Sequence, residues 1–274
     1  MITLLSDFGY QDAYVAVMKG VIASIAPGVE LCDLTHNIPP QDILAARFNL
    51  MSACAYFPVN TVHLAVVDPG VGSKRRAIAL QYADGFLVGP DNGLFSGVLQ
   101  QASLTSRPLI KAVVLTNARY WRSPHPSVTF HGRDIFAPAA AHLAKGVEIN
   151  KLGDRIDPGS LVQPALPPLT QQPTGASALY IGSIQYIDGF GNLITNIPAQ
   201  LVPHEPWQMT LKTALGTHHF SSIKTYSDVP TGILSALIGS HGWIEIACVG
   251  GSAAAALKKS GGVAVGTPIE LRLA

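Results

Sequence analysis

The alternation of short apolar runs with helical periodicity over residues 1–145 constrains the fold of this chain most. Apolar runs at 2–5, 29–34 and 62–67 alternate with segments 14–25 and 41–56, whose apolar side chains recur at helical spacing. The run 62–67 is apolar at nearly every position, which is typical of a strand covered by helices on both faces. This order predicts an α/β layered fold with a mostly parallel sheet.

The pattern changes after a proline-rich segment, 157–177, which we interpret as a linker. Beyond it, helical periodicity nearly vanishes. Short β-like runs separated by Gly, Pro, Asn and Asp predict a small antiparallel barrel or sandwich; they lie at 179–187, 193–197, 207–212, 233–238, 243–249 and 268–273. We therefore expect an N-terminal α/β domain over 1–165 and a C-terminal β-barrel domain over 175–274.

Composition excludes several classes of protein. The formal net charge is +1 and no basic block occurs, so nucleic acid is not an expected partner. No apolar run is long enough to cross a bilayer, and the first residues lack the pattern of a signal peptide, so we expect a cytoplasmic protein without membrane contact. The three cysteines form no CxxC pair and the histidines no i, i+4 ligand pair, so no metal is expected.

A sparse polar set stands out, because only 13% of the residues are charged. Asp68 ends an apolar run and opens a glycine-rich loop, Arg75 closes that loop, and His131 lies far downstream in Phe130-His131-Gly132-Arg133-Asp134. The loop has neither the Walker nor the GxGxxG spacing. At this level Asp68 and Arg75 could form a merely structural ion pair, and a lone histidine near a helix start is more often structural than catalytic.

Other residues carry two interpretations each. Asp7 follows the first strand, where a carboxylate suits a ribose diol, but Asp7 and Asp12 could also cap the next helix. Asn192, in Asp188-Gly189-Phe190-Gly191-Asn192, could present its amide to a heterocycle or simply form a hairpin turn. The backbone near Gly250 could bind a ligand or begin a short helix.

Together these segments resemble the S-adenosylmethionine-dependent chlorinase, fluorinase and hydroxide adenosyltransferase superfamily over essentially the whole chain. The resemblance rests on several motifs in order: Ser6-Asp7-Phe8-Gly9, Asp33-Leu34-Thr35-His36, Val67-Asp68-Pro69-Gly70-Val71-Gly72 with Arg75-Arg76, Gly89-Pro90-Asp91-Asn92-Gly93, Phe130-His131-Gly132-Arg133-Asp134, and Asp188-Gly189-Phe190-Gly191-Asn192.

The resemblance implies a Rossmann-like N-terminal domain, a C-terminal β-barrel and a homotrimer with the substrate at the subunit interface. Asp68, Arg75 and His131 match the set that marks the hydroxide branch. The implied reaction converts S-adenosylmethionine and water to adenosine and methionine, with the substrate itself supplying the adenosyl group and no further cofactor. The implied binding roles are ribose for Asp7, adenine for Asn192, Gly250 and Tyr226, and the methionine end for Asp12, Asp188 and Ser240.

Two departures and two alternatives remain open at this stage. His241 stands where relatives place a glycine or an arginine, which leaves the contact to the methionine carboxylate in doubt. Gln41 replaces an aromatic that closes the halide pocket of fluorinases. The alternatives are a chlorinase, which a charged set beside the attack point disfavours, and a non-catalytic protein that binds S-adenosylmethionine or adenosine. The proton acceptor could be Asp68 or His131.

Overall fold

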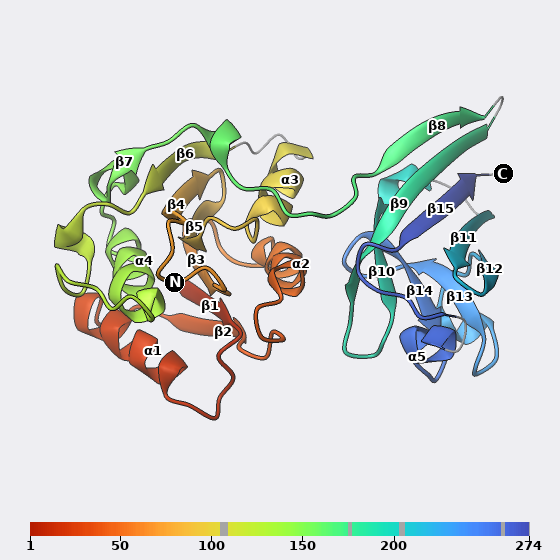
Figure 1. The fold of residues 1–274 in the computed structure, drawn as a ribbon, viewed down its shortest axis with the longest axis horizontal. Helices are drawn as coiled ribbons and strands as arrows, with labels where there is room; N and C mark the ends of the chain where they lie inside the picture. The colour runs from red at the N-terminus through yellow and green to blue at the C-terminus, as the bar shows by residue number, and fades with distance from the viewer. Residues whose placement is uncertain (105–108, 175–176, 203–205, 259–260, 274) are drawn as a thin grey trace. The chain divides into compact units, whose positions relative to one another are not determined.

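The computed structural model describes residues 1–104, 109–174, 177–202, 206–258 and 261–273. The chain divides into two compact units, Met1–Pro164 and Ala165–Ala274. A seven-stranded sheet forms the centre of the first unit, in the order β2-β1-β3-β5-β4-β6-β7 (Figure 1). Its strands are β1 (Ile2–Ser6), β2 (Leu31–Thr35), β3 (Thr61–Val66), β4 (Ala77–Tyr82), β5 (Gly85–Pro90), β6 (Leu109–Val114) and β7 (Asp154–Arg155).

The direction of the strands is mixed, which corrects the expectation of a mostly parallel sheet. β2, β1, β3 and β5 run parallel, as the alternation with helices predicted. β4 pairs antiparallel with β5 and with β6, and β6 with β7. The cause is local: only Ala83 and Asp84 separate β4 from β5, and so short a connection makes a hairpin, because a parallel pair needs a long crossover.

One pair of helices lies on each side of this sheet (Figure 1). The helices of the unit are α1 (Tyr14–Ile25), α2 (Ile43–Cys54), α3 (Ser96–Leu104) and α4 (Ala137–Ala144). α1 packs against α4 and buries Val15, Met18 and Ile22, which recur at helical spacing. α2 packs against α3. The helical spacing over 14–25 and 41–56 predicted α1 and α2 to within two residues. Pro138 lies in the first turn of α4, where proline is tolerated.

The second unit is an antiparallel sheet in the order β12-β11-β15-β9-β10-β14-β13, with β8 paired to β9. A bridge between Ser222 and Ala236 joins the two ends, so the sheet closes almost into the predicted barrel. The elements are β8 (Thr170–Thr174), β9 (Ser177–Ile187), β10 (Leu193–Pro198), β11 (Trp207–Thr213), β12 (Gly216–Ser221), β13 (Leu234–Ile238), β14 (Trp243–Cys248), α5 (Ala253–Lys258) and β15 (Pro268–Leu273).

Two strands of the barrel differ from the sequence analysis. β8 lies inside the segment expected to be a linker, and β12 was not predicted. Among the described residues, no helix is long and apolar enough to cross a membrane.

Candidate active site

Asp68, Arg75 and His131 come together in the first unit, although 56 residues separate Arg75 from His131. Arg75 is the central member. Its Nε donates to Asp68 Oδ1 at 2.8 Å, and a terminal nitrogen, Nη2, pairs with Asp68 Oδ2. The same Nη2 contacts His131 Nδ1 at 2.8 Å. The side chains of Asp68 and Arg75 are only 7% and 10% exposed, so solvent screens this group weakly.

The contact with Arg75 fixes the protonation state of His131. A guanidinium has donors but no acceptor, so His131 Nδ1 must accept the hydrogen bond. The ring is then neutral and carries its hydrogen on Nε2. Burial and the positive charge of Arg75 both lower the pKa of His131 below its usual value, and the carboxylates of Asp68 and Asp134 only partly oppose them. Arg75 also lies over the ring of Phe136, 5.2 Å from its centre.

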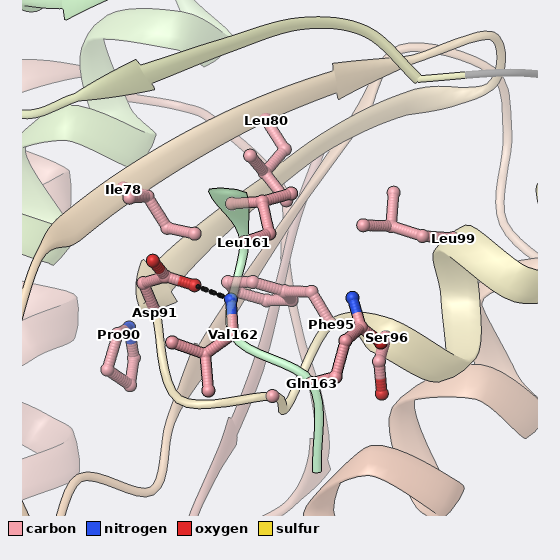
Figure 2. A pocket seen from close by; sticks show the side chains of 11 residues that line it. Ile78, Leu80, Pro90, Asp91, Phe95, Ser96, Leu99, Leu161, Val162 and Gln163 are labelled. Carbon is pink, nitrogen blue, oxygen red and sulfur yellow. Dashed lines mark hydrogen bonds between the residues drawn. The ribbon is translucent and has the colours of Figure 1, made fainter. Parts of the chain in front are cut away.

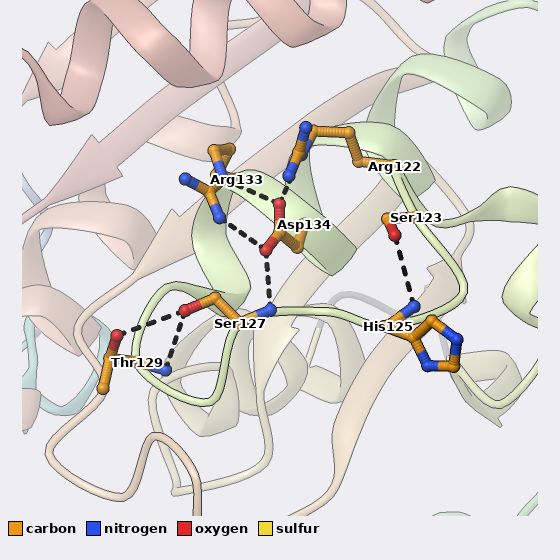
Figure 3. Close-up of polar contacts among 7 residues, drawn as sticks. All are labelled: Arg122, Ser123, His125, Ser127, Thr129, Arg133 and Asp134. Atoms are coloured by element: carbon orange, nitrogen blue, oxygen red, sulfur yellow. Dashed lines mark hydrogen bonds and ion pairs between the residues drawn. The ribbon is translucent and has the colours of Figure 1, made fainter.

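His131 lies at the start of an irregular turn of helix, and a buried carboxylate holds that turn in place. Gly132–Phe136 is a π-helical turn that leads into α4, a feature frequent at functional sites. Asp134 accepts from the backbone N–H of Ser127 at 2.8 Å and from the guanidinium groups of Arg122 and Arg133 (Figure 3). These donors hold the pKa of Asp134 well below its usual range. The loop before His131 is thereby tied to the helix after it.

A pocket of about 380 Å³ opens beside these residues. Asp7, Gln41, Asp68 and His131 supply most of its polar lining, while Phe8, Tyr14 and Phe130 form one aromatic wall. The three rings lie 5.2–5.8 Å apart, centre to centre. Such a pocket, apolar with a few convergent polar groups, is the usual form of a small-molecule site. Arg75 does not line the pocket, so it contacts Asp68 and His131 but not the space that a ligand would occupy.

Asp7 lines this pocket and lies directly after β1. Its Oδ2 accepts the backbone N–H of Gln41 at 2.8 Å, and Gln41 adopts a positive φ of 65°. The capping interpretation of Asp7 and Asp12 is wrong, because Ala13 occupies the N-cap of α1 and no side chain caps it. Asp12 is exposed and does not line the pocket.

A buried histidine holds the loop that carries Asp7. His36 Nδ1 lies 2.7 Å from the Ser6 hydroxyl, and the His36 carbonyl accepts the N–H of Gly9 at 2.8 Å. The Ser6 hydroxyl also accepts the N–H of Phe8. Asp33 and Lys19 continue this network toward α1. The segment from Ser6 to Gly9 is therefore fixed before any ligand arrives.

In the second unit, Asp188 and Asn192 bind each other. Asp188 Oδ1 accepts the backbone N–H groups of Phe190 and Asn192, and its Oδ2 accepts from the Asn192 side-chain amide at 3.0 Å. These contacts close the loop between β9 and β10, as the hairpin interpretation predicted. Gly191 is required there, because a Cβ would lie 2.0 Å from the Ser252 hydroxyl oxygen at the start of α5.

The structure adds Glu245, a buried residue that sequence reasoning missed, and joins it to Tyr226 and His241. Glu245 accepts from the hydroxyl of Tyr226 with one oxygen and lies 3.0 Å from His241 Nε2 with the other. His241 Nδ1 accepts the N–H of Trp243. Burial and the negative charges of Glu245 and Asp188 raise the pKa of Tyr226. A lone glutamate in the apolar strand β14 was the signal that could have revealed it.

The two remaining predicted site residues, Ser240 and Gly250, lie at exposed positions. Ser240 is exposed in the turn between β13 and β14, and Gly250 is exposed with a φ of 68° after β14. Five of the ten predicted site residues, Asp7, Asp12, Asp68, Arg75 and His131, belong to the first unit, and Asp188, Asn192, Tyr226, Ser240 and Gly250 belong to the second. Among the described residues, no group of three or more His, Cys, Asp or Glu side chains is placed to hold a metal ion.

Comparison with known proteins finds relatives that match most of the chain. Models of the SAM hydroxide adenosyltransferase N-terminal and C-terminal domains match residues 2–153 and 182–266. A protein of Thermus thermophilus called (R)-S-adenosyl-L-methionine hydrolase is 39% identical, with 97% of each chain covered. One from Salinispora tropica with the same name is 38% identical, with 92% of each covered.

More distant sequences and solved structures complete the comparison. A fluorinase of an Actinoplanes species is 29% identical over 72% of this chain and 71% of its own. The crystal structure of an uncharacterized conserved protein from Thermotoga maritima superposes with a TM-score of 0.85 at 34% identity, covering 99% of this chain and all of that one. On these matches, the chain belongs to the SAM hydroxide adenosyltransferase family.

Proposed function

We propose that this protein hydrolyses S-adenosyl-L-methionine to adenosine and L-methionine. The observation that carries the proposal is the Asp68–Arg75–His131 group, in which the Asp68 and Arg75 side chains are nearly removed from solvent and which lies at a pocket with an aromatic wall. The names of the relatives at 38–39% identity support it. Fluorinases are similar at lower identity and over less of the chain, so a chlorinase is the less favoured alternative.

The reaction needs a water molecule placed in line with the bond from C5′ to sulfur. A C5′–O bond forms, the C5′–S bond breaks with its electron pair going to sulfur, and methionine leaves as a neutral thioether. The water must lose one proton. Correct placement of reactants supplies roughly 7–11 kcal/mol of the barrier, and base assistance about 10²–10⁴-fold.

The hydrogen-bond pattern favours Asp68 as the proton acceptor. His131 accepts from Arg75 with Nδ1 and carries a hydrogen on Nε2, so in this state it donates rather than accepts at its other nitrogen. A carboxylate has about four acceptor positions, and Arg75 leaves some of them on Asp68 unused. In this proposal, His131 orients the water, Asp68 takes its proton, and Arg75 fixes both.

The substrate-binding roles follow from the same proposal. Asp7 accepts the ribose hydroxyls, since Gln41 occupies only part of its acceptor capacity. Asn192 and the backbone near Gly250 contact adenine. Tyr226, a residue that is 45% exposed and whose hydroxyl donates to Glu245, stacks on the adenine.

Asp12, Asp188 and Ser240 bind the methionine end. The exposed carboxylate of Asp12 and the charge of Asp188 suit its ammonium group. His241 is outside this set. Its Nε2 hydrogen bonds to Glu245 and its Nδ1 accepts from Trp243, so it supports Tyr226 rather than binding the methionine carboxylate.

We extend the proposal to the assembly. A homotrimer with the site at the subunit interface, domain bounds of 1–165 and 175–274, a cytoplasmic location and the lack of any cofactor besides the substrate all stay predictions. The proposed site residues are divided between the two units, which supports a site that takes residues from both units. Sedimentation of the purified protein measures the assembly, and a monomer that turns over substrate at full rate would contradict it.

Adenosine release in ¹⁸O-labelled water tests the function. We expect adenosine with the label at its 5′ hydroxyl and an equal amount of methionine. The same incubation with chloride separates the alternatives. A 5′-chloro nucleoside as the main product would establish the chlorinase, and ligand binding without product above background would establish a non-catalytic binding protein.

A further inference from the structure

We propose that the turn Asp91-Asn92 is a positioning element that holds both ends of the loop carrying Asp68 and Arg75. The turn follows β5 and is part of Gly89-Pro90-Asp91-Asn92-Gly93, a motif to which the proposed reaction gives no role. The inference rests on the proposed function, because it assigns to this turn an effect on the catalytic group.

Asn92 holds the entry of the loop. Its side-chain Nδ2 donates to the carbonyl oxygen of Val67 at 2.8 Å, and its Oδ1 accepts the N–H of Leu94 at 3.3 Å. The Val67 carbonyl and the N–H of Asp68 share one planar peptide unit. Val67 is fully buried, so no water competes for that carbonyl. The bond from Asn92 therefore sets the direction in which the chain leaves β3 into Asp68.

Asp91 holds the exit of the loop. Its side chain is only 4% exposed and pairs with Arg76, whose Nε lies 2.7 Å from Oδ2. The other oxygen accepts the N–H of Val162 at 3.0 Å (Figure 2). Arg76 also donates to the hydroxyl and the carbonyl of Ser160. Because Arg76 follows Arg75 directly, a fixed Arg76 fixes the backbone from which Arg75 reaches Asp68.

The two adjacent residues thus hold the loop at positions 67 and 76, between which the chain contains Gly70 and Gly72. Gly72 has a φ of 77° and lies so close to the Val128 carbonyl that a Cβ would be 2.6 Å away. Gly93 allows Pro164 to approach the turn closely, since a Cβ there would lie 2.9 Å from the nitrogen of Pro164. The segment Ser160–Pro164 therefore packs against the same turn, immediately before the chain continues into the second unit.

Asn117 offers a matched control for Asn92. Its Nδ2 donates to the Lys151 carbonyl at 2.7 Å and its Oδ1 accepts the N–H of Arg119 at 3.2 Å, the same pattern with partners outside the loop from Val67 to Arg76. Asn→Asp at either position keeps the Oδ1 acceptor and removes the donor to a backbone carbonyl. Asn92→Ala and Asn117→Ala form a second pair, without the added charge, should either aspartate variant fail to fold.

The experiment compares the kcat and KM of the purified variants for adenosine release. We expect Asn92→Asp to lower kcat about 10²-fold, the order of loss for a misplacement near 1 Å, with KM unchanged and Asn117→Asp like wild type. A purely structural role would lower stability in both variants and leave kcat alone. Wild-type kcat in both Asn92 variants, or an equal fall in the Asn117 variants, overturns the inference.

A second readout does not depend on turnover. The ¹⁵N chemical shifts of the His131 ring report its hydrogen bond from Arg75 directly. We expect them to move in the Asn92 variants and to stay in the Asn117 variants; unchanged shifts in the Asn92 variants refute the positioning role. If wild-type protein releases no adenosine, the proposed function fails, and this measurement still decides the inference.

Discussion

Replacement of Arg75 by lysine tests the central claim about the catalytic group. Lysine keeps the positive charge beside Asp68, but its ammonium donates from a single atom and cannot reproduce the planar fork. Arg75 donates from two nitrogens to Asp68 and from one of them to His131. An ammonium that stays with Asp68 loses one of those bonds and the link to His131.

The expected loss follows from the burial of the group. Two charge-assisted hydrogen bonds at about 1.5 kcal/mol each, the low end of their range, amount to about 3 kcal/mol of unfolding free energy. Turnover suffers more, because both the water orientation and the base depend on this arginine; we expect kcat to fall by about 10²–10⁴-fold, with KM little changed.

The assay is adenosine release under saturating substrate, together with urea unfolding of the same preparations. Arg119→Lys, at an exposed arginine, is the control and should match wild type in both measurements. Wild-type kcat in Arg75→Lys would refute the reasoning, because a point charge would then be sufficient and the bridging geometry unnecessary. Loss of stability with full activity would have the same consequence.

Three further predictions concern titration and stability. Protonation of His131 would place an N–H against Arg75, so kcat should fall as the pH drops through the pKa of His131, which burial and Arg75 hold below 6.5. An acid-side midpoint of kcat at 6.5 or above would contradict this. Asp134→Asn should lower the unfolding free energy by about 1.5–3 kcal/mol in urea titrations, because it weakens the bonds from Arg122 and Arg133; an unchanged midpoint would exclude this role. Burial lowers the pKa of His63 to about 4, so the unfolded chain binds more protons than the folded chain between pH 6.5 and 4. The unfolding free energy should therefore fall on acidification across that window. In His63→Gln this part of the pH dependence should disappear.

The outline of the fold was predictable because local signals agreed with the tertiary structure. The β1 strand and helix α1 appear where the apolar run at 2–5 and the helical spacing over 14–25 placed them. The strand β12 was missed because its sequence, Gly-Thr-His-His-Phe-Ser, is mostly polar and is held by pairing to β11. β8 contains a proline at 173, which argued for a linker, yet edge strands tolerate proline.

The resemblance to the superfamily grouped Asp68, Arg75 and His131, and the structure brings these three side chains together. The central position of Arg75 was not predictable, because it depends on side-chain geometry that the sequence motifs do not contain. Glu245 shows the same limit, because it stands out as a lone glutamate in an apolar strand while its partners do not. Its burial is stabilised by His241, which lies four residues earlier, and by Tyr226, which lies 19 residues earlier between β12 and β13.

The adjacency of Arg75 and Arg76 has a consequence for how this loop can evolve. Arg75 reaches Asp68 and His131, whereas its neighbour reaches Asp91 and Ser160. Directly after them, Ala77 pairs with Pro90 in the sheet, which fixes the end of the loop. A deletion of one residue between Gly72 and Arg75 would bring Arg76 to the place of Arg75, an insertion would bring Arg75 to the place of Arg76, and either change would otherwise strain the turn. The loop should therefore accept substitutions at exposed positions such as Ser73 and Lys74 while its length stays constant across homologues.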